Sequence, residues 1–120
     1  MGISAANSDA IQAKKVLGTT VKDASGEKIG HIEDIVLDKR SNNIVFAIVG
    51  FGGFLRMGEK YHPIPWGSLT YDEREGAYVV PFSREMLEAA PADSIDALVA
   101  GNAVAYRDRA YDYYKAPRYW

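Results

Sequence analysis

The sequence predicts a mainly β fold, a small barrel or roll of about six short strands with one or two short helices. Apolar, β-branched runs recur at close spacing, separated by clusters of Gly, Asn, Asp and Ser that favour tight turns. The length of 120 residues fits one domain, and the 48% hydrophobic content is enough for a packed core. The run Ile44–Phe51 is apolar on both faces, which is typical of a strand that is covered on both sides.

The first part of the chain contains the elements that would begin the barrel. Residues 1–14 are small and polar and form a weakly ordered lead-in with at most a frayed helical turn. After them we expect a β-type run at Val16–Val21, a reversal at Asp23–Glu27 and a strand at Ile29–Asp38. The apolar residues of this last strand do not keep one alternating phase. A bulge near Gly30 or at Glu33–Asp34 would restore them to a common face.

The middle of the chain combines the most apolar strand with a loop rich in glycine. A polar hairpin at Lys39–Asn43, in which tandem Asn tolerates left-handed backbone, leads into Ile44–Phe51. The loop Gly52–Lys60 follows this strand. The next segment, Tyr61–Trp66, is extended, and its prolines lack the N–H that a ladder needs. It therefore belongs at a sheet edge or a barrel corner.

The last part of the chain changes from strands to helices. We expect a hairpin between Ser68 and Phe82, followed by a short helix over Arg84–Ala90 that Ser83 caps and Pro91 ends. A second, brief helix containing Ile95, Leu98 and Val99 stops at Gly101. The chain is thus divided into a lead-in (1–14), a barrel domain (15–91) and a helical, aromatic tail (92–120).

Composition and charge exclude several classes of function. The chain has no cysteine, which removes disulfides, thiolate metal sites and cysteine nucleophiles. A net charge of −2 argues against a nucleic-acid binder, which usually carries a basic excess. No apolar run reaches the roughly 20 residues that a membrane-spanning helix requires. We expect a cytoplasmic protein, or a periplasmic one if a signal peptide has been removed.

Three segments carry motifs whose combination is specific: Gly26–Asp38 with G-E-x-I-G, Val45–Leu55 with F-G-G-F, and Gly58–Trp66 with G-E-K-x-x-x-I-P-W. In this order they resemble the PRC-barrel family, which is named for the photosynthetic reaction centre. The resemblance covers roughly Lys15 to Pro91.

The resemblance implies a compact, SH3-like β-barrel. The family includes the cytoplasmic domain of the reaction centre H subunit and a domain of a ribosome maturation factor, in which the barrel mainly contacts other macromolecules. This chain lacks the transmembrane helix of the first and the second β-domain of the other. The fold and the idea of a docking surface therefore carry over, whereas neither specific function does.

Groups that could carry catalysis or bind a metal are few. His31 and His62 are the only histidines, and no zinc-type spacing or nucleophile motif accompanies them. Glu33, Asp34 and Asp38 share one strand but lack the spacing of a calcium loop, so a solvated outer face explains them. We expect no catalytic residue, no metal and no cofactor.

Apolar and aromatic side chains are the stronger candidates for contact with a partner. The glycine-rich loop carries large apolar residues, and the tail crowds Tyr and Trp with basic residues. The candidate partner-binding residues are Phe51, Phe54, Leu55, Met57, Tyr113, Tyr114 and Trp120. A small-molecule pocket at the barrel mouth would use Tyr61, His62 and Trp66.

The tail has a second expected role as a cover. It would pack on its own barrel or on a neighbouring subunit and shield Val45, Ala47 and Val49. The sequence as a whole predicts a non-enzymatic interaction or assembly module that self-associates, as a homodimer, and docks another macromolecule, expected to be a protein, through the apolar loop and the tail aromatics. The alternatives are an RNA- or ribosome-associated factor, which the charge does not favour, and a small-molecule sensor.

Overall fold

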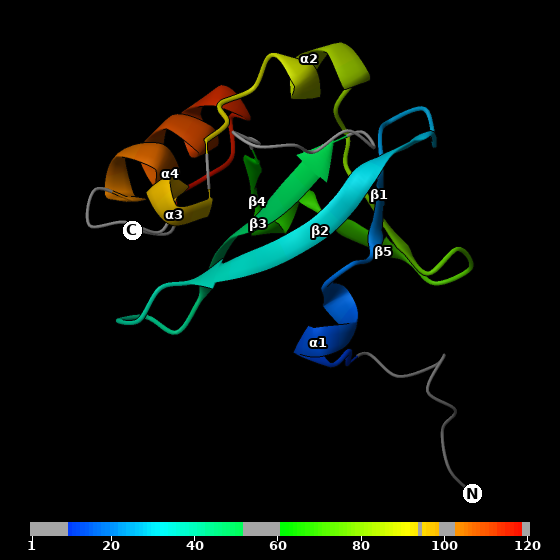
Figure 1. The fold of residues 1–120 in the computed structure, drawn as a ribbon, viewed down its shortest axis with the longest axis horizontal. Coiled ribbons are helices and arrows are strands. Elements are labelled where there is room, and N and C mark those ends of the chain that lie inside the picture. Colours follow the sequence, from blue (N-terminus) through cyan, green and yellow to red (C-terminus); the bar gives the residue numbers. More distant parts are fainter. Residues whose placement is uncertain (1–9, 52–60, 94, 99–102, 119–120) are drawn as a thin grey trace, which may run out of the picture.

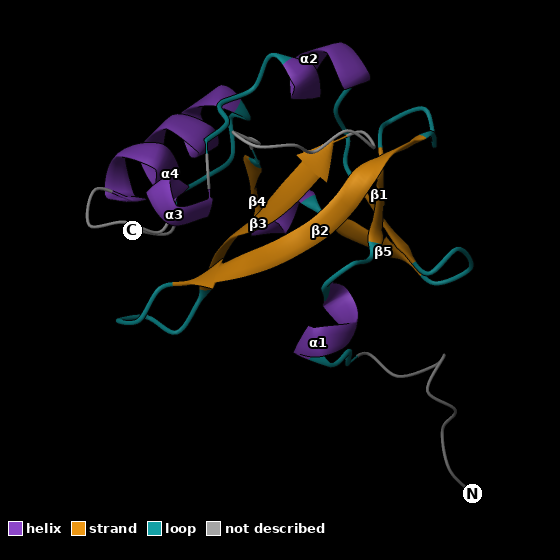
Figure 2. Ribbon diagram, in the orientation of Figure 1, coloured by secondary structure: helices purple, strands orange, loops and turns teal. Residues whose placement is uncertain are grey.

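The structure is a computed structural model, and it describes residues 10–51, 61–93, 95–98 and 103–118. Six strands form one strongly bent sheet in the order β4-β3-β2-β1-β6-β5 (Figures 1 and 2). The strands are β1 (Thr20–Lys22), β2 (Lys28–Leu37), β3 (Ile44–Phe51), β4 (His62–Pro65), β5 (Thr70–Asp72) and β6 (Ala77–Val79). Among these six described strands, only β1 and β6 pair in parallel. The mainly β fold with six strands confirms the predicted class.

Short helices surround the sheet. They are α1 (Ala13–Val16), α2 (Arg84–Glu88), α3 (Ile95–Leu98), α4 (Ala103–Tyr113) and the 3-10 helix η2 (Trp66–Ser68), which connects β4 to β5. The predicted cap of α2 is present, since the Ser83 hydroxyl oxygen accepts a hydrogen bond from the Met86 N–H at 3.2 Å. The brief helix before Gly101 is also confirmed as α3. The eleven-residue helix α4 was not predicted as a separate element.

Strand β2 contains the irregularities that its sequence predicts. The pairing with β3 shifts register between Ile32 and Asp34, so that Glu33 is the extra residue of a bulge. The pairing with β1 also shifts, around Ile29. The bulges bring Ile29, Ile32 and Ile35 to the same hydrophobic cluster inside the bent sheet. Leu37, which was expected on the same face, is exposed instead, so that part of the prediction was wrong. Gly30 lies so close to Gly50 of β3 that any side chain would overlap its carbonyl group.

The start of the barrel differs from the prediction. The run from Val16 is not one strand, because Val16 ends helix α1 and strand β1 begins only at Thr20. Gly18 separates the two elements with a φ of 84°, a left-handed conformation that residues with a Cβ rarely adopt. Its N–H donates to the Ile32 carbonyl at 2.6 Å, which anchors the turn on β2. Val16 is nevertheless buried in the barrel cluster, from the helix.

The proline-rich segment lies at the sheet edge, as predicted. Strand β4 pairs with β3 on one side only, with Pro63 opposite Ile48 and Pro65 opposite Phe46. At its start, Tyr61 exchanges backbone hydrogen bonds with Asp93, at 2.7 and 3.0 Å. Helix α4 packs along β4. The edge is therefore protected by missing donors, by a short bridge and by a helix.

Strand β3 separates two hydrophobic cores. Ala47 and Val49 belong to the core inside the bent sheet. Val45, Phe46 and Ile48 belong to a second core, which Leu98 of α3 and Tyr111 of α4 complete. Figure 1 shows α3 and α4 lying over β3 and β4 on the side of the sheet away from α1.

The predicted cover of β3 therefore exists and comes from the same chain. The tail was predicted to shield Val45, Ala47 and Val49. This was wrong for Ala47 and Val49, which face the barrel. Counting alternate residues from Val45 failed because Val45 and Phe46, although adjacent, both contribute to the outer core.

Candidate functional site

An open cleft of about 860 Å³ lies where four segments distant in sequence meet. They are the β2–β3 hairpin, the β4–η2 junction, the residues after β6, and the end of α4 with the chain that follows it. Its aromatic lining residues are Trp66, Phe82, Tyr111 and Tyr114, and three prolines, Pro65, Pro81 and Pro117, lie among them. We call this feature the aromatic cleft.

Local sequence explains how the barrel side of the cleft forms. The extended Pro-Ile-Pro strand ends in η2, whose turn is closed by the Leu69 N–H donating to the Trp66 carbonyl at 3.1 Å. The Trp66 ring packs on Tyr78, with ring centres 5.7 Å apart. Trp66 remains half-buried, so one part of the indole is held by the core while another part stays accessible in the cleft.

The C-terminal side depends on how α4 ends. Lys115 takes a φ of 55°, and the Ala116 N–H donates to the Tyr111 carbonyl at 2.9 Å, a left-handed helix termination. This turn reverses the chain, so that Ala116 and Pro117 line the cleft beside Tyr111 and Tyr114. A β-branched residue in place of Lys115 would resist this turn.

The two tyrosines of α4 are fixed by different contacts. The Tyr111 hydroxyl donates to the Val45 carbonyl at 2.5 Å, and this ring is only 5% exposed. Tyr114 is equally buried and stacks at a tilt on Phe82, with centres 4.6 Å apart. Its hydroxyl is buried without a hydrogen-bond partner, and burial raises the pKa of Tyr114 well above its ordinary value. The cleft is thus built on rings that the two cores hold in place.

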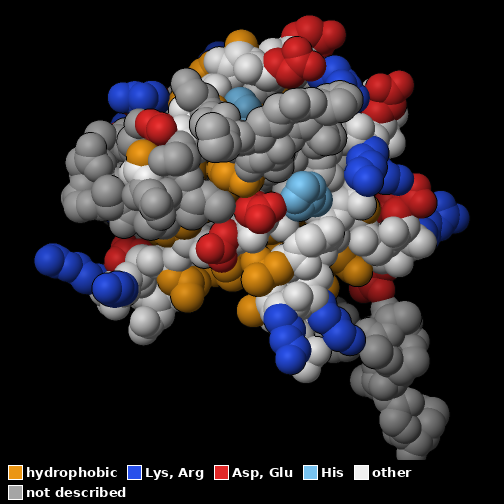
Figure 3. Space-filling model, viewed as in Figure 1, with side chains coloured by type: hydrophobic (Ala, Val, Ile, Leu, Met, Phe, Trp, Pro, Cys, Tyr) orange, Lys and Arg blue, Asp and Glu red, His pale blue; other side chains and the backbone are white. Residues whose placement is uncertain are grey.

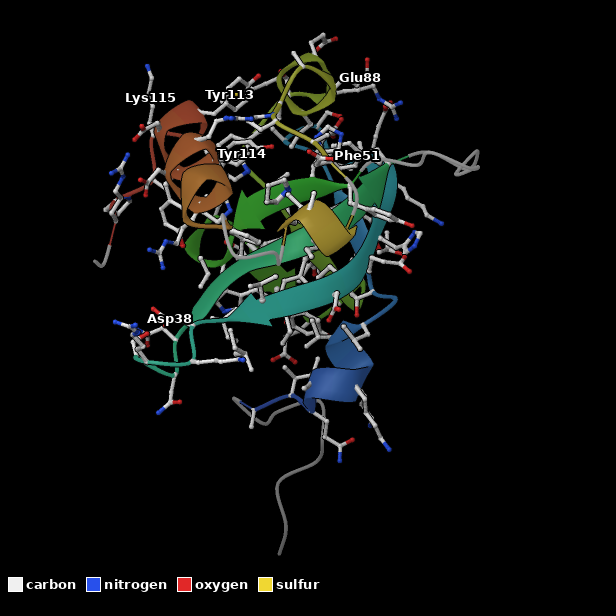
Figure 4. The ribbon with its side chains drawn as sticks, turned by 60° about the vertical axis from the view of Figure 1, so that its left-hand side comes forward. Asp38, Phe51, Glu88, Tyr113, Tyr114 and Lys115 are labelled. Atoms are coloured by element: carbon white, nitrogen blue, oxygen red, sulfur yellow. The ribbon has the colours of Figure 1, made fainter. Side chains whose placement is uncertain are left out.

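The structure brings together only part of the predicted site. Trp66 and Tyr114, predicted for two different roles, line the same cleft. Tyr113 points toward α2, where its hydroxyl donates to the Met86 carbonyl at 2.7 Å (Figure 4). Tyr61 packs at the second core. Phe54, Leu55, Met57 and Trp120 lie outside the described residues.

Phe51 and His62 form a separate pair away from the aromatic cleft. Their rings stack with centres 4.3 Å apart. His62 is buried, and this burial lowers its pKa to about 4, although a hydrogen bond to the Pro91 backbone acts in the opposite direction. Its Nδ1 atom is buried without a partner. At neutral pH His62 is therefore an uncharged packing residue.

The remaining titratable groups give no sign of a reaction centre in the part of the chain that the structure describes. No group of three or more His, Asp or Glu residues is placed to hold a metal ion there. His31 contacts Glu33 at 2.9 Å on the exposed side of β2. What the cleft offers chemically is aromatic surface, proline rings and the amide and hydroxyl groups of Asn42, Asn43 and Ser68.

Sequence reasoning missed Phe82, Tyr111 and the two asparagines as parts of one site. One signal was available for the tyrosines. If residues 103–113 are read as a helix, Tyr111 and Tyr114 stand three residues apart and share a face. No local signal links that face to Asn42 or Phe82, because only the tertiary fold joins them.

Comparison with known proteins gives one family match and similarity to a solved structure. The family model described as PRC-barrel domain matches residues 8–87. Among solved structures, the chain is similar to that of a 16S ribosomal RNA processing protein, RimM, from Pseudomonas aeruginosa. The identity is 13% and the TM-score 0.42, and the match covers 69% of this chain and 50% of that one. No protein with curated function matches.

The chain accordingly spans about half the length of that ribosomal RNA processing protein. Within the described residues, no helix has both the length and the apolar character needed to cross a membrane. The family match extends over two-thirds of the chain and includes every strand of the sheet. The chain belongs to the PRC-barrel domain family.

Proposed function

We propose that this chain is an interaction module without catalytic chemistry, which docks a partner protein through the aromatic cleft. The observation that carries the proposal is the convergence of four aromatic side chains from separate segments on one open cleft. Tyr and Trp combine a large apolar area with a polar group and are enriched at the energetically important positions of interfaces.

The rigidity of the cleft supports a docking role. Its rings are pre-positioned by core packing, because Trp66 rests on Tyr78 and Phe82 rests on Tyr114. A partner would therefore bind without paying for the ordering of these side chains, which is the main entropic cost of a flexible interface. The chain belongs to a family of small β-barrels, and its sequence contains no known catalytic motif. Both observations are consistent with a docking role.

Self-association remains a prediction with a narrower basis. The outer face of β3 is covered by Leu98 and Tyr111 of the same chain, so it does not require a second subunit. We propose the aromatic cleft as the surface through which a homodimer would form. Light scattering on the full chain, compared with a Trp66→Ala variant, tests whether a dimer forms through the cleft. A monomer at all concentrations would remove self-association from the proposal.

A small-molecule sensor is the second candidate, and the size of the cleft favours it. A volume of about 860 Å³ is within the range of pockets that hold small ligands. Of the three residues predicted for such a pocket, Trp66 lines the cleft. A ligand that changes Trp66 fluorescence in a Trp120→Phe background, in which Trp66 is the only tryptophan, would support the sensor.

Site-specific crosslinking tests the docking proposal directly. A photoreactive amino acid at Ser68, which lines the cleft, is compared with the same amino acid at Ser25, which is exposed in the β1–β2 turn. In cells, the Ser68 probe should give one dominant adduct with another protein that the Ser25 probe does not give. Equal adducts from both positions, or none from Ser68, would contradict docking at the cleft.

A further inference from the structure

Charge is distributed unevenly around the aromatic cleft. The two segments that flank it, residues 38–40 and 107–118, contain six Lys and Arg against three Asp, a net charge of +3. The rest of the chain therefore has a net charge of −5, which together with these segments gives the total of −2. Among the residues that the structure describes, Lys115 is the one charged residue that lines the cleft, and no Asp or Glu does. The segments that flank the cleft are thus basic, whereas the chain as a whole has a net charge of −2.

The acidic residues of these flanking segments are already paired. Asp38 lies 3.8 Å from Arg107. Asp112 and Asp108 lie 2.7 and 3.7 Å from Arg118. By contrast, no ion pair within the described residues involves Lys39, Arg40 or Lys115. All three are exposed, so their charges are available to an occupant.

These cations stand on two sides of the cleft. Basic side chains project from the tip of the β2–β3 hairpin in Figure 3. Lys39 and Arg40 belong to this hairpin, and Asn42 and Asn43, which follow them in the sequence, line the cleft. Lys115 projects outward from the end of α4, beyond Tyr113 and Tyr114 (Figure 4). The aromatic floor is thus bordered by positive charge on both the hairpin and the helix.

We infer that the aromatic cleft binds an acidic, extended peptide segment of a partner protein, an inference that rests on the proposed docking function. The charge of the flanking segments is complementary to Asp and Glu side chains. The rings and prolines offer flat surfaces to apolar or proline side chains of a peptide. Asn42, Asn43 and Ser68 carry donors and acceptors that match the unpaired main chain of an extended segment.

Single-stranded nucleic acid is the other anionic polymer that aromatic rings could bind, and the observations favour it less. Strand binding without sequence preference uses a positive groove that follows the backbone. Here three unpaired cations border one cleft of a chain whose net charge is −2. A peptide with a few carboxylates matches this number of charges. Binding of RNA is therefore treated as an alternative outcome of the experiment that follows.

Selection from a display library of random short peptides, on the full chain with Trp120→Phe, tests the inference. We expect the enriched peptides to be rich in Asp and Glu and to change the fluorescence of Trp66. Reversing the charges with Lys39→Glu, Arg40→Glu and Lys115→Glu should lower the affinity for these peptides by about tenfold or more. The matched control reverses three exposed lysines elsewhere, with Lys14→Glu, Lys15→Glu and Lys28→Glu. It should lower the affinity for the peptides by less than about threefold.

Each outcome separates the inference from the function on which it rests. Peptides that change Trp66 fluorescence but are neutral or basic would overturn the acidic occupant and leave docking at the cleft intact. Equal weakening by both charge reversals would also overturn it, because the attraction would not belong to the cleft. Tighter binding of an oligouridine probe than of every peptide would assign the cleft to RNA. If no peptide affects Trp66, both the inference and the docking proposal fail.

Discussion

Removing the contact between the C-terminal helices and β3 should destabilise the whole protein. Leu98 is fully buried in the outer core, and truncation of such a leucine to alanine costs about 2–5 kcal/mol through lost burial and a residual cavity. Tyr111→Phe removes one hydroxyl whose acceptor, the Val45 carbonyl, stays buried. We expect that variant to lose about 1–2 kcal/mol.

Urea unfolding followed by circular dichroism measures both losses. For a domain of this length, each kcal/mol corresponds to a fall in Tm of about 4 °C. Leu37→Ala is the matched control, because it makes the same chemical change at a leucine that is 57% exposed. It should change the free energy of unfolding by less than about 0.5 kcal/mol.

The comparison has a clear negative result. If Leu98→Ala unfolds at the same urea midpoint as Leu37→Ala, then α3 does not contribute to a core with β3. Two separate transitions in the unmutated protein would also contradict the reasoning, because barrel and tail would then unfold independently. A single transition that shifts with Leu98→Ala and Tyr111→Phe would agree with one cooperative unit.

Three further predictions concern single positions. Gly30→Ala should cost about 3 kcal/mol or more or prevent folding, because its Cβ would overlap the Gly50 carbonyl group; normal yield and an unchanged Tm would contradict this. His62, with a pKa lowered from 6.5 to about 4, should cost stability as the pH falls, since the unfolded chain binds the proton first. Between pH 7 and 5 we expect a loss of about 1–2 kcal/mol that His62→Gln abolishes, and an equal slope in both proteins would contradict the assignment. Ser83→Ala should cost about 1 kcal/mol through the lost cap of α2, measured by thermal unfolding, whereas Ser83→Asp should retain most of it.

Features set by a few neighbouring residues could be predicted from the sequence. The broken alternation of Ile29, Ile32 and Ile35 required a bulge, and the structure has one at Glu33. Pro63 and Pro65 required an edge, and β4 is an edge strand. For the bulge, the apolar side chains must face the core; for the edge strand, the prolines lack the N–H donor that a central strand needs. Each rule of local geometry leaves few alternatives.

Features that depend on contacts between distant segments could not be predicted. The sequence indicated that both faces of β3 are covered, but it left open which chain supplies the second cover. That choice depends on where α3 and α4 pack, and no periodicity of the sequence encodes it. The aromatic cleft has the same origin, since Phe82 and Tyr111 become neighbours only when α4 lies along β4.

Tyr111 and Tyr114 connect the stability of the fold to the proposed site. Both line the cleft, yet each is buried in a core, Tyr111 in the one outside β3 and Tyr114 in the one inside the sheet. The cleft therefore cannot exist in a barrel that has lost its C-terminal helices, although the family match ends at residue 87. An occupant that binds the cleft contacts side chains that also hold α4 on the barrel. Binding must then favour the docked tail, because ligand that binds only the assembled form shifts the equilibrium toward it.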